Sequence, residues 1–185
     1  GGGQGGGWPA TFTDVAAAVD ALAASSAPLD LDRVVLLGHS AGGHLALWAA
    51  GRDRLPGDAP GARPLVRPRA VIAQAPVADL ERARSLIAPG GLVFDLLGGG
   101  PDAVPERYAL ANPARQVPLD VPALLVHGAE DQTVSVGQSR DYAARARAAG
   151  AQVELVEPPG ANHRAHVDPR SPAWAAVTGR LGDLA

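Results

Sequence analysis

The sequence contains no cysteine, no methionine and no lysine among its 185 residues. The absence of cysteine excludes disulfide bonds and thiolate metal sites, and it leaves the redox compartment undetermined. All sixteen basic residues are arginines, a bias that we attribute to coding composition rather than to an arginine-specific function. Because position 1 is glycine and no methionine is present, we expect a processed, trimmed or incomplete chain.

The sequence also lacks a strong net charge and any long hydrophobic run. The formal net charge is −3 and the isoelectric point is near 5.9, so we expect no nucleic acid and no membrane partner. No stretch approaches the roughly 18 apolar residues of a membrane helix, and no signal peptide opens the chain. A cytoplasmic location is therefore the default expectation. A hydrophobic content of 46% at this length predicts one globular domain, residues 1–185.

The most informative segment is residues 34–44, where an apolar, β-branched run leads into Gly38-His39-Ser40-Ala41-Gly42. Small, helix-forming residues follow at once. A serine on a sharp strand-to-helix turn takes backbone angles that only small neighbours allow, and we expect Gly38 and Gly42 to supply that room. The turn would raise the Ser40 hydroxyl above the sheet and aim the Ala41 N–H at the same space. Ser40 is the candidate nucleophile, and a turn that only packs is the alternative.

Helical and strand patterns alternate along the chain. We predict helices at about 11–23, 41–51, 137–149 and 172–184, and strands at 33–37, 70–73, 123–126 and 153–156. This alternation is typical of an α/β fold in which a parallel sheet is flanked by helices. At the start of the first helix, Thr11 and Asp14 resemble a capping box.

Three other segments have weaker patterns. Residues 1–7 are almost all glycine, which indicates flexibility by composition. Residues 52–68 are rich in Pro, Gly and Arg and are interpreted as a surface loop. Residues 77–121 have weak periodicity and several prolines, so we interpret them as a cap-like insertion over the top of the sheet.

A nucleophilic serine needs a base within hydrogen-bond reach and a group that orients the base. In parallel α/β sheets the loops after the strand carboxyl ends meet at one edge. Two such loops hold Asp131 and His163, so we predict Ser40, His163 and Asp131 as nucleophile, base and acid. Glu130 and Asp79 are the competing acids. Asp131 is preferred because it has the His-Gly-x-x-Asp spacing after the strand at 123–126.

The other histidines have simpler interpretations. His166 competes with His163 as the base, but we expect it to be a surface or substrate-side residue. We expect His39 to pack beneath the serine turn, His44 to lie one turn into the following helix, and His127 to be buried and hydrogen-bonded. No His, Asp and Glu set has convincing metal-ligand spacing, so no metal and no cofactor are expected.

These segments resemble the α/β-hydrolase superfamily over essentially the whole chain. Residues 38–43 resemble its nucleophile elbow, 127–134 its acid loop and 160–163 its histidine loop, in the chain order Ser, Asp, His. Residues 8–15 are similar to a segment of esterases and arylformamidase-like hydrolases, and dipeptidyl-peptidase-like relatives share the three loops. The resemblance implies a serine hydrolase, and Trp8 is the candidate for a wall of its substrate pocket.

An oxyanion hole needs two donors, and the family's second donor comes from a loop after an earlier strand. Between Gly7 and Ser40 the chain has room for only one helix and one strand, so the glycine segment does not fit that loop. The resemblance then implies that the amino-terminal part of the sheet lies outside this sequence. The strand before Ser40 would form an open, apolar edge, and the chain alone would be poorly soluble or inactive.

The sequence therefore predicts a carboxylic-ester hydrolase that works through an acyl-enzyme on Ser40, with a small-molecule ester or amide as substrate. Two alternatives stay open at this point. The first is amide cleavage, by an arylformamidase-like or peptidase reaction. The second is a non-catalytic hydrolase-fold module that binds partners.

Overall fold

The computed structural model describes residues 6–83, 86 and 88–184, so the first five positions of the glycine segment predicted to be flexible lie outside it. The described α-helices are α1 (Ala10–Asp20), α2 (Ala41–Ala50), α3 (Leu92–Leu97), α4 (Pro105–Ala111), α5 (Gly137–Ala148) and α6 (Pro172–Leu184). The strands are β1 (Val35–His39), β2 (Ala70–Gln74), β3 (Ala123–Val126) and β4 (Val153–Val156).

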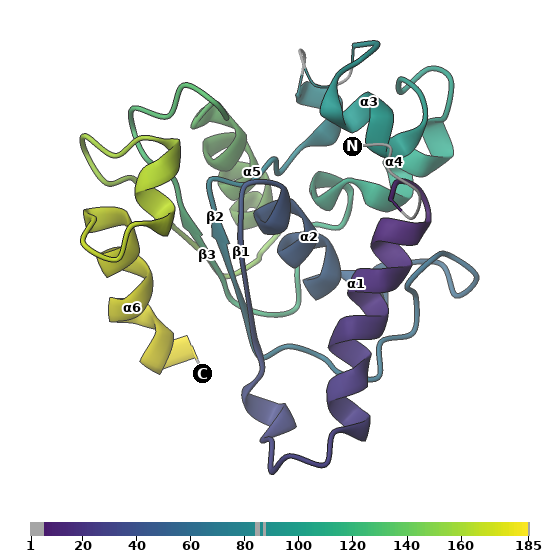
Figure 1. Cartoon of the computed structure of the whole chain (residues 1–185), viewed down its shortest axis with the longest axis horizontal. Coiled ribbons are helices and arrows are strands. Elements are labelled where there is room, and N and C mark those ends of the chain that lie inside the picture. The colour runs from purple at the N-terminus through teal and green to yellow at the C-terminus, as the bar shows by residue number, and fades with distance from the viewer. Residues whose placement is uncertain (1–5, 84–85, 87, 185) are drawn as a thin grey trace.

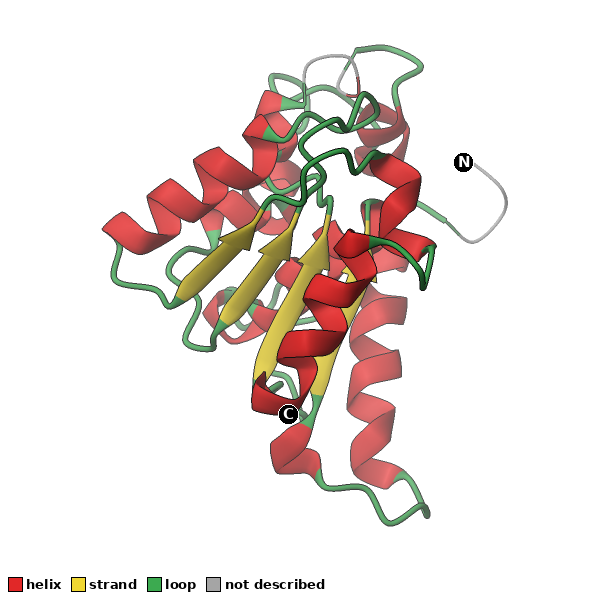
Figure 2. Ribbon diagram, turned by 90° about the vertical axis from the view of Figure 1, so that its left-hand side faces the viewer, coloured by secondary structure: helices red, strands yellow, loops and turns green. Residues whose placement is uncertain are grey.

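The four strands form one sheet in the order β1-β2-β3-β4, and every neighbouring pair is parallel. Figure 2 shows their arrowheads pointing the same way, with the carboxyl-terminal helix α6 in front of the sheet. The predicted strands at 123–126 and 153–156 are confirmed with these bounds, whereas β1 both begins and ends two residues later than the predicted 33–37. The predicted α/β fold with a parallel sheet flanked by helices is thus confirmed.

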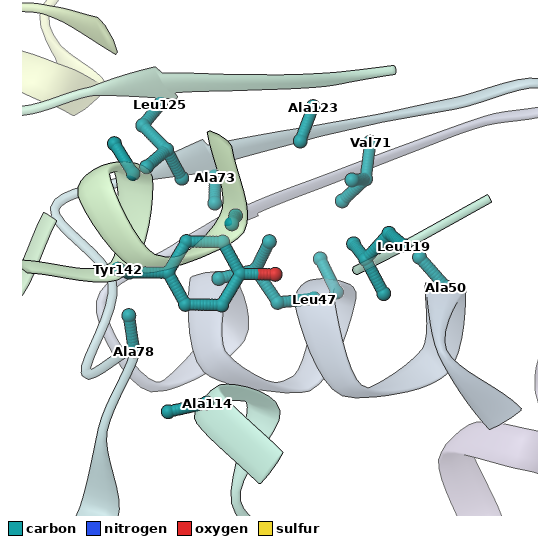
Figure 3. Packing of buried hydrophobic residues seen from close by; sticks show 13 residues of the cluster. Leu47, Ala50, Val71, Ala73, Ala78, Ala114, Leu119, Ala123, Leu125 and Tyr142 are labelled. Carbon is teal, nitrogen blue, oxygen red and sulfur yellow. The ribbon is translucent and has the colours of Figure 1, made fainter. Parts of the chain in front are cut away.

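Helices cover both faces of the sheet because successive strand residues point to opposite sides. On one face, Val71, Ala73 and Leu125 pack against α2 and α5, a cluster that Figure 3 shows around Leu47 and Tyr142. On the other face, a smaller cluster of sheet residues packs against Ala173 and Val177 of α6, namely Ile72, Leu124 and Val126. Figure 1 shows α6 on the opposite side of the strands from α2. The central strands β2 and β3 are buried throughout.

Helix α1 packs on α2 rather than on the sheet. Phe12 is fully buried, and its ring centroid lies 4.9 Å from that of Trp48 in α2. The predicted capping box at Thr11 is wrong. Pro9 already has near-helical backbone angles and is the N-cap, so Thr11 lies inside the first turn. Its hydroxyl instead accepts a hydrogen bond from the Gly7 N–H, at 3.0 Å.

The segment predicted as an insertion carries α3 and α4, which Figure 1 places near the upper ends of α1 and α2. Two side chains of α2 bind the carboxyl-terminal end of α4. The His44 Nε2–H donates to the Ala111 carbonyl and the Trp48 Nε1–H donates to the Leu110 carbonyl, each at 2.9 Å. The insertion is therefore anchored to the helix that follows Ser40. Its role as a cap stays a prediction.

Strand β1 lies at one edge of the sheet, and the Leu37 side chain there is 45% exposed. An edge strand presents unpaired backbone groups and, here, apolar side chains. Of the helices in the described ranges, none has both the length and the apolar character needed to cross a membrane.

The buried His44 makes the fold sensitive to acid. Burial lowers the pKa of His44 from 6.5 to about 4, and its hydrogen bond to Ala111 opposes this shift only in part. Between pH 6.5 and 4, His44 is therefore protonated more in the unfolded chain than in the folded one. The folded state keeps its full stability above pH 6.5 and loses stability as the pH falls toward 4. We expect the free energy of unfolding to fall by roughly 3 kcal/mol across this range because of His44.

Urea unfolding at several pH values between 7.5 and 4 measures this loss. His44→Gln keeps an N–H donor for Ala111 but cannot titrate, so its stability should depend less steeply on pH. Parallel pH dependences for the two proteins would contradict the assignment to His44.

Candidate active site

Ser40 lies on the turn between β1 and α2 and has backbone angles φ 56° and ψ −119°. This left-handed conformation is strained for a residue with a side chain, and strain of this kind clusters at functional sites. The turn is held to the neighbouring strand, because the Ser40 N–H donates to the Gln74 carbonyl at 2.8 Å. Ser40 thus occupies a sharp strand-to-helix turn, as predicted from the sequence.

The glycines of this turn differ from the prediction in one respect. A Cβ at Gly38 would lie only 2.1 Å from the Gly42 carbonyl oxygen, so glycine is needed there. A Cβ at Gly42 would meet nothing within 4 Å, and the expectation that Gly42 supplies side-chain room is wrong. Gly43 is the second tight position, because a Cβ there would lie 3.1 Å from the Gly38 carbonyl oxygen and 3.1 Å from the Pro76 Cβ. The reason is that the backbone of Gly42, not its missing side chain, approaches Gly38.

The structure brings the three predicted residues together in one hydrogen-bonded chain. The Ser40 Oγ lies 3.0 Å from His163 Nε2, and His163 Nδ1 lies 2.6 Å from Asp131 Oδ2. A carboxylate can only accept, so Nδ1 carries a proton; in the neutral ring Nε2 then accepts from the Ser40 hydroxyl. The Asp131 side chain is fully buried and that of His163 is 15% exposed. A solvent-accessible hydroxyl–imidazole pair is thus backed by a buried carboxylate.

Asp131 is held by its backbone surroundings as well as by His163. Its Oδ1 accepts from the N–H groups of Thr133 and Val134, at 2.8 and 2.9 Å. Burial alone would raise the pKa of Asp131, but the hydrogen bonds from His163, Val134 and Thr133 lower it below its ordinary value. The carboxylate is therefore charged at neutral pH and can stabilise an imidazolium next to it.

Neither competing acid bonds to the His163 ring in the part of the chain that the structure describes, although Glu130 borders the same hollow as His163. The Glu130 side chain is exposed, although its N–H donates to the Ala161 carbonyl at 3.0 Å. Asp79 is buried and forms a 2.9 Å ion pair with Arg145 of α5, and it accepts from Asn112 at 2.9 Å. Asp79 therefore joins the insertion to α5 and does not contact His163.

A close backbone approach joins the acid loop to the histidine loop. A Cβ at Gly128 would lie 2.2 Å from the Ala161 carbonyl oxygen. Only glycine allows this separation, which places Asp131 and His163 on adjoining turns. Sequence reasoning missed the role of Gly128; its position two residues after the buried strand β3 was the available signal.

The prediction that His166 lies at the surface or substrate side is wrong, because its side chain is fully buried. Its Nε2 accepts from the Gly128 N–H at 3.1 Å, so it packs under the site instead. Its wrong assignment has a physical cause: residues 163–167 form a 3-10 helix that turns His166 inward. His127 is buried and hydrogen-bonded as predicted, to Ser139 and to the Val134 carbonyl.

Ala41 is the first residue of α2, where backbone N–H groups have no partner within the helix. Its N–H is the one predicted to face an oxyanion, and that role stays a prediction. Trp8 lies against Phe12, with ring centroids 5.2 Å apart, and its backbone N–H donates to the Leu96 carbonyl. Trp8 therefore belongs to the packing between α1 and α3, and its proposed part in a substrate pocket stays a prediction.

Two hollows border the Ser40–His163–Asp131 chain. One, of about 230 Å³, adjoins His163, Asn162 and Thr133. The other, of about 660 Å³, lies between the acid loop and the beginning of the insertion and includes Asp131, Gln132, Arg82 and Val77 in its wall. Within the described part of the chain no group of three or more His, Asp or Glu residues could hold a metal ion.

A parallel sheet with a serine on a strained turn after β1, a buried acid after β3 and a histidine after β4 defines an α/β-hydrolase. The BD-FAE family model matches residues 4–145, and the chain belongs to this family. A comparison with curated protein sequences gave no match.

Several solved structures share this fold. A truncated form of a carbohydrate esterase from gut microbiota has a TM-score of 0.81 at 24% identity, covering 96% of this chain and 69% of its own. An acetyl ester-xyloside bifunctional hydrolase from Caldicellulosiruptor lactoaceticus has a TM-score of 0.75 at 26% identity, and the match covers 97% of this chain and 67% of that protein. A carboxylesterase from Lactobacillus plantarum WCFS1 has a TM-score of 0.71 at 21% identity, and the match covers 98% of this chain and 68% of that protein. The chain thus spans about two thirds of these proteins.

The glycines at the serine turn give a matched pair of variants. Gly38→Ala should destabilise the protein by more than about 2 kcal/mol, because its Cβ would overlap the Gly42 carbonyl. Gly42→Ala should change stability by less than about 1 kcal/mol, since its Cβ has open space and alanine favours a helix. Urea unfolding of both variants tests this difference, and equal midpoints would refute it.

Proposed function

We propose that the protein hydrolyses carboxylic esters through an acyl-enzyme on Ser40. The single observation that carries this proposal is the continuous hydrogen-bond chain from the Ser40 hydroxyl through the His163 ring to the buried Asp131 carboxylate. A hydroxyl with a base on one side and a fixed acid behind that base is the arrangement that acyl transfer needs.

In the first half-reaction, the Ser40 Oγ attacks the ester carbonyl carbon while His163 Nε2 takes the hydroxyl proton. The tetrahedral oxyanion accepts a hydrogen bond from the Ala41 N–H. The intermediate then collapses, the ester C–O bond breaks, and the departing alcohol takes the proton from His163 Nε2. Asp131 holds the Nδ1–H tautomer and stabilises the transient imidazolium.

In the second half-reaction, water replaces the alcohol as nucleophile. His163 Nε2 removes a proton from the water as it attacks the acyl carbon, and the new tetrahedral intermediate expels Ser40. The serine oxygen recovers its proton from His163, and the carboxylic acid leaves. Proton and electron counts balance without any further reactant.

We propose acylated carbohydrates as the first substrates to test. The support is the class of the structural relatives, which include a carbohydrate esterase and an acetyl ester-xyloside hydrolase. The hollow beside Asp131 is consistent with a polar substrate, because Gln132, Thr133 and Ser135 are in its wall.

The nucleophile is tested with Ser40→Ala in the protein at its full natural length. A fluorophosphonate probe should label Ser40, and hydrolysis of p-nitrophenyl acetate and of acetylated xylose should fall by at least about 10³-fold in the variant. An N-formyl aryl amide and a peptide amide, run in parallel, separate ester from amide cleavage. Probe labelling and turnover that survive in Ser40→Ala would overturn the proposal.

The acid is tested with two neighbouring carboxylates. Asp131→Asn should lower kcat by roughly 10³- to 10⁴-fold, because an amide does not hold the Nδ1–H tautomer or offset the imidazolium charge. Glu130→Gln is the matched control: this exposed carboxylate borders the hollow beside His163 but does not bond to its ring, so kcat should fall by less than about 3-fold. A large loss in Glu130→Gln with a small one in Asp131→Asn would reverse the assignment.

A further inference from the structure

His39 directly precedes Ser40, and its side chain reaches the histidine loop. Its Nε2 lies 3.0 Å from the backbone carbonyl oxygen of His163. Because a carbonyl oxygen can only accept, His39 Nε2 carries the proton and donates it. The residue next to the candidate nucleophile is therefore bonded to the main chain of the candidate base, 124 residues away in the sequence.

The histidine rings cluster around this bond. The His39 ring centroid lies 4.6 Å from that of His163, with the ring planes tilted by 44°, and 5.6 Å from that of His166, on which it stacks with an angle of 28° between the planes. The His127 ring meets His166 edge-on, at 6.3 Å. Four of the five histidines in the sequence thus lie together, and only His44 lies apart from them.

Two further hydrogen bonds hold the same turn of the chain. The Gln74 side-chain amide, at the end of β2, donates to the His166 carbonyl at 2.9 Å. The Gly128 N–H, just after β3, donates to His166 Nε2 at 3.1 Å. The turn at His163–Val167 is thus tied to the ends of three strands, and His39 makes the contact nearest to the reacting atoms.

The surroundings keep His39 neutral. Burial lowers the pKa of His39, the charge of His163 lowers it further, and the hydrogen bond to the His163 carbonyl and the charge of Asp131 oppose the shift. A neutral ring gives His39 one donor, which the His163 carbonyl occupies. His39 is therefore suited to a fixed structural hydrogen bond rather than to proton transfer.

We propose that His39 is a positioning residue for the candidate base, which it holds through the hydrogen bond from its Nε2–H to the His163 carbonyl. This inference rests on the proposed ester hydrolysis. The bonds of the His163 ring to Ser40 and Asp131 constrain its side chain, and the side-chain bonds from Gln74 and to the Gly128 N–H hold the turn at His166, whereas the bond from His39 is made at the carbonyl of His163 itself. A misplacement of about 1 Å at a reacting group can cost on the order of 10²-fold in rate.

Two substitutions separate the donor from the ring. His39→Gln keeps an N–H donor at a similar reach and removes the ring, whereas His39→Phe keeps an aromatic ring for stacking and removes the donor. We expect kcat to fall by about 10- to 100-fold in His39→Phe, with KM unchanged, and by less than about 3-fold in His39→Gln. The reaction is hydrolysis of p-nitrophenyl acetate by the protein at its full natural length.

A double-mutant cycle tests whether His39 acts through the base. In a His163→Ala background there is no ring to position, so adding His39→Phe should leave the residual rate unchanged. Full additivity would instead mean that His39 shapes the serine turn itself, and this would overturn the proposal. Equal losses in His39→Phe and His39→Gln, or wild-type kcat in His39→Phe, would also overturn it.

Two controls keep the test decisive. Urea unfolding shows whether His39→Phe is folded; should it not fold, His39→Leu serves as the smaller variant without a donor and is judged by the same criteria. Ser40→Ala separates this inference from the proposed function. Turnover that persists in Ser40→Ala refutes the ester hydrolase, whereas turnover that needs Ser40 but not the His39 donor refutes only the positioning role.

Discussion

The hydrogen bond between the Asp131 carboxylate and the His163 ring is the interaction on which the rest of the site depends. A buried carboxylate is costly to desolvate, and it persists only when several donors satisfy its oxygens. Asp131 has three such donors, two from the backbone of its own loop and one from His163. The same bonds that stabilise the charge fix which nitrogen of His163 faces Ser40. The hydrogen bonds that the buried Asp131 carboxylate requires therefore also fix the orientation of the His163 ring.

The sheet turns this local constraint into a shared site, because each group follows the carboxyl end of a different parallel strand. Two close backbone approaches shape the site: Gly38 against Gly42 within the serine turn, and Gly128 against Ala161 between the acid and histidine loops. In both places glycine is selected by space that a Cβ would occupy, rather than by backbone freedom. Hydrogen bonds from Gln74 and His39 then hold the histidine loop in place.

Much of this arrangement could be predicted from the sequence, because it depends on local patterns. Short apolar runs predicted β3 and β4 with their bounds, and the spacing of Ser40, Asp131 and His163 after strand ends predicted which side chains meet. What could not be predicted depends on the path of the backbone. A 3-10 turn carries His166 into the interior, Pro9 caps α1 ahead of Thr11, and the backbone carbonyl of Gly42, rather than its absent side chain, approaches Gly38. Periodicity does not record such approaches between distant segments.

Helix α2 connects the serine turn to the insertion and so links the reaction centre to the segment expected to border the substrate. Ser40 caps this helix, while His44 and Trp48 bind the carbonyls at the end of α4. The wall of the larger hollow near Asp131 also includes Val77 and Arg82 at the start of the insertion. Helix α2 therefore contacts both the serine turn and the insertion, so the two are held by the same element.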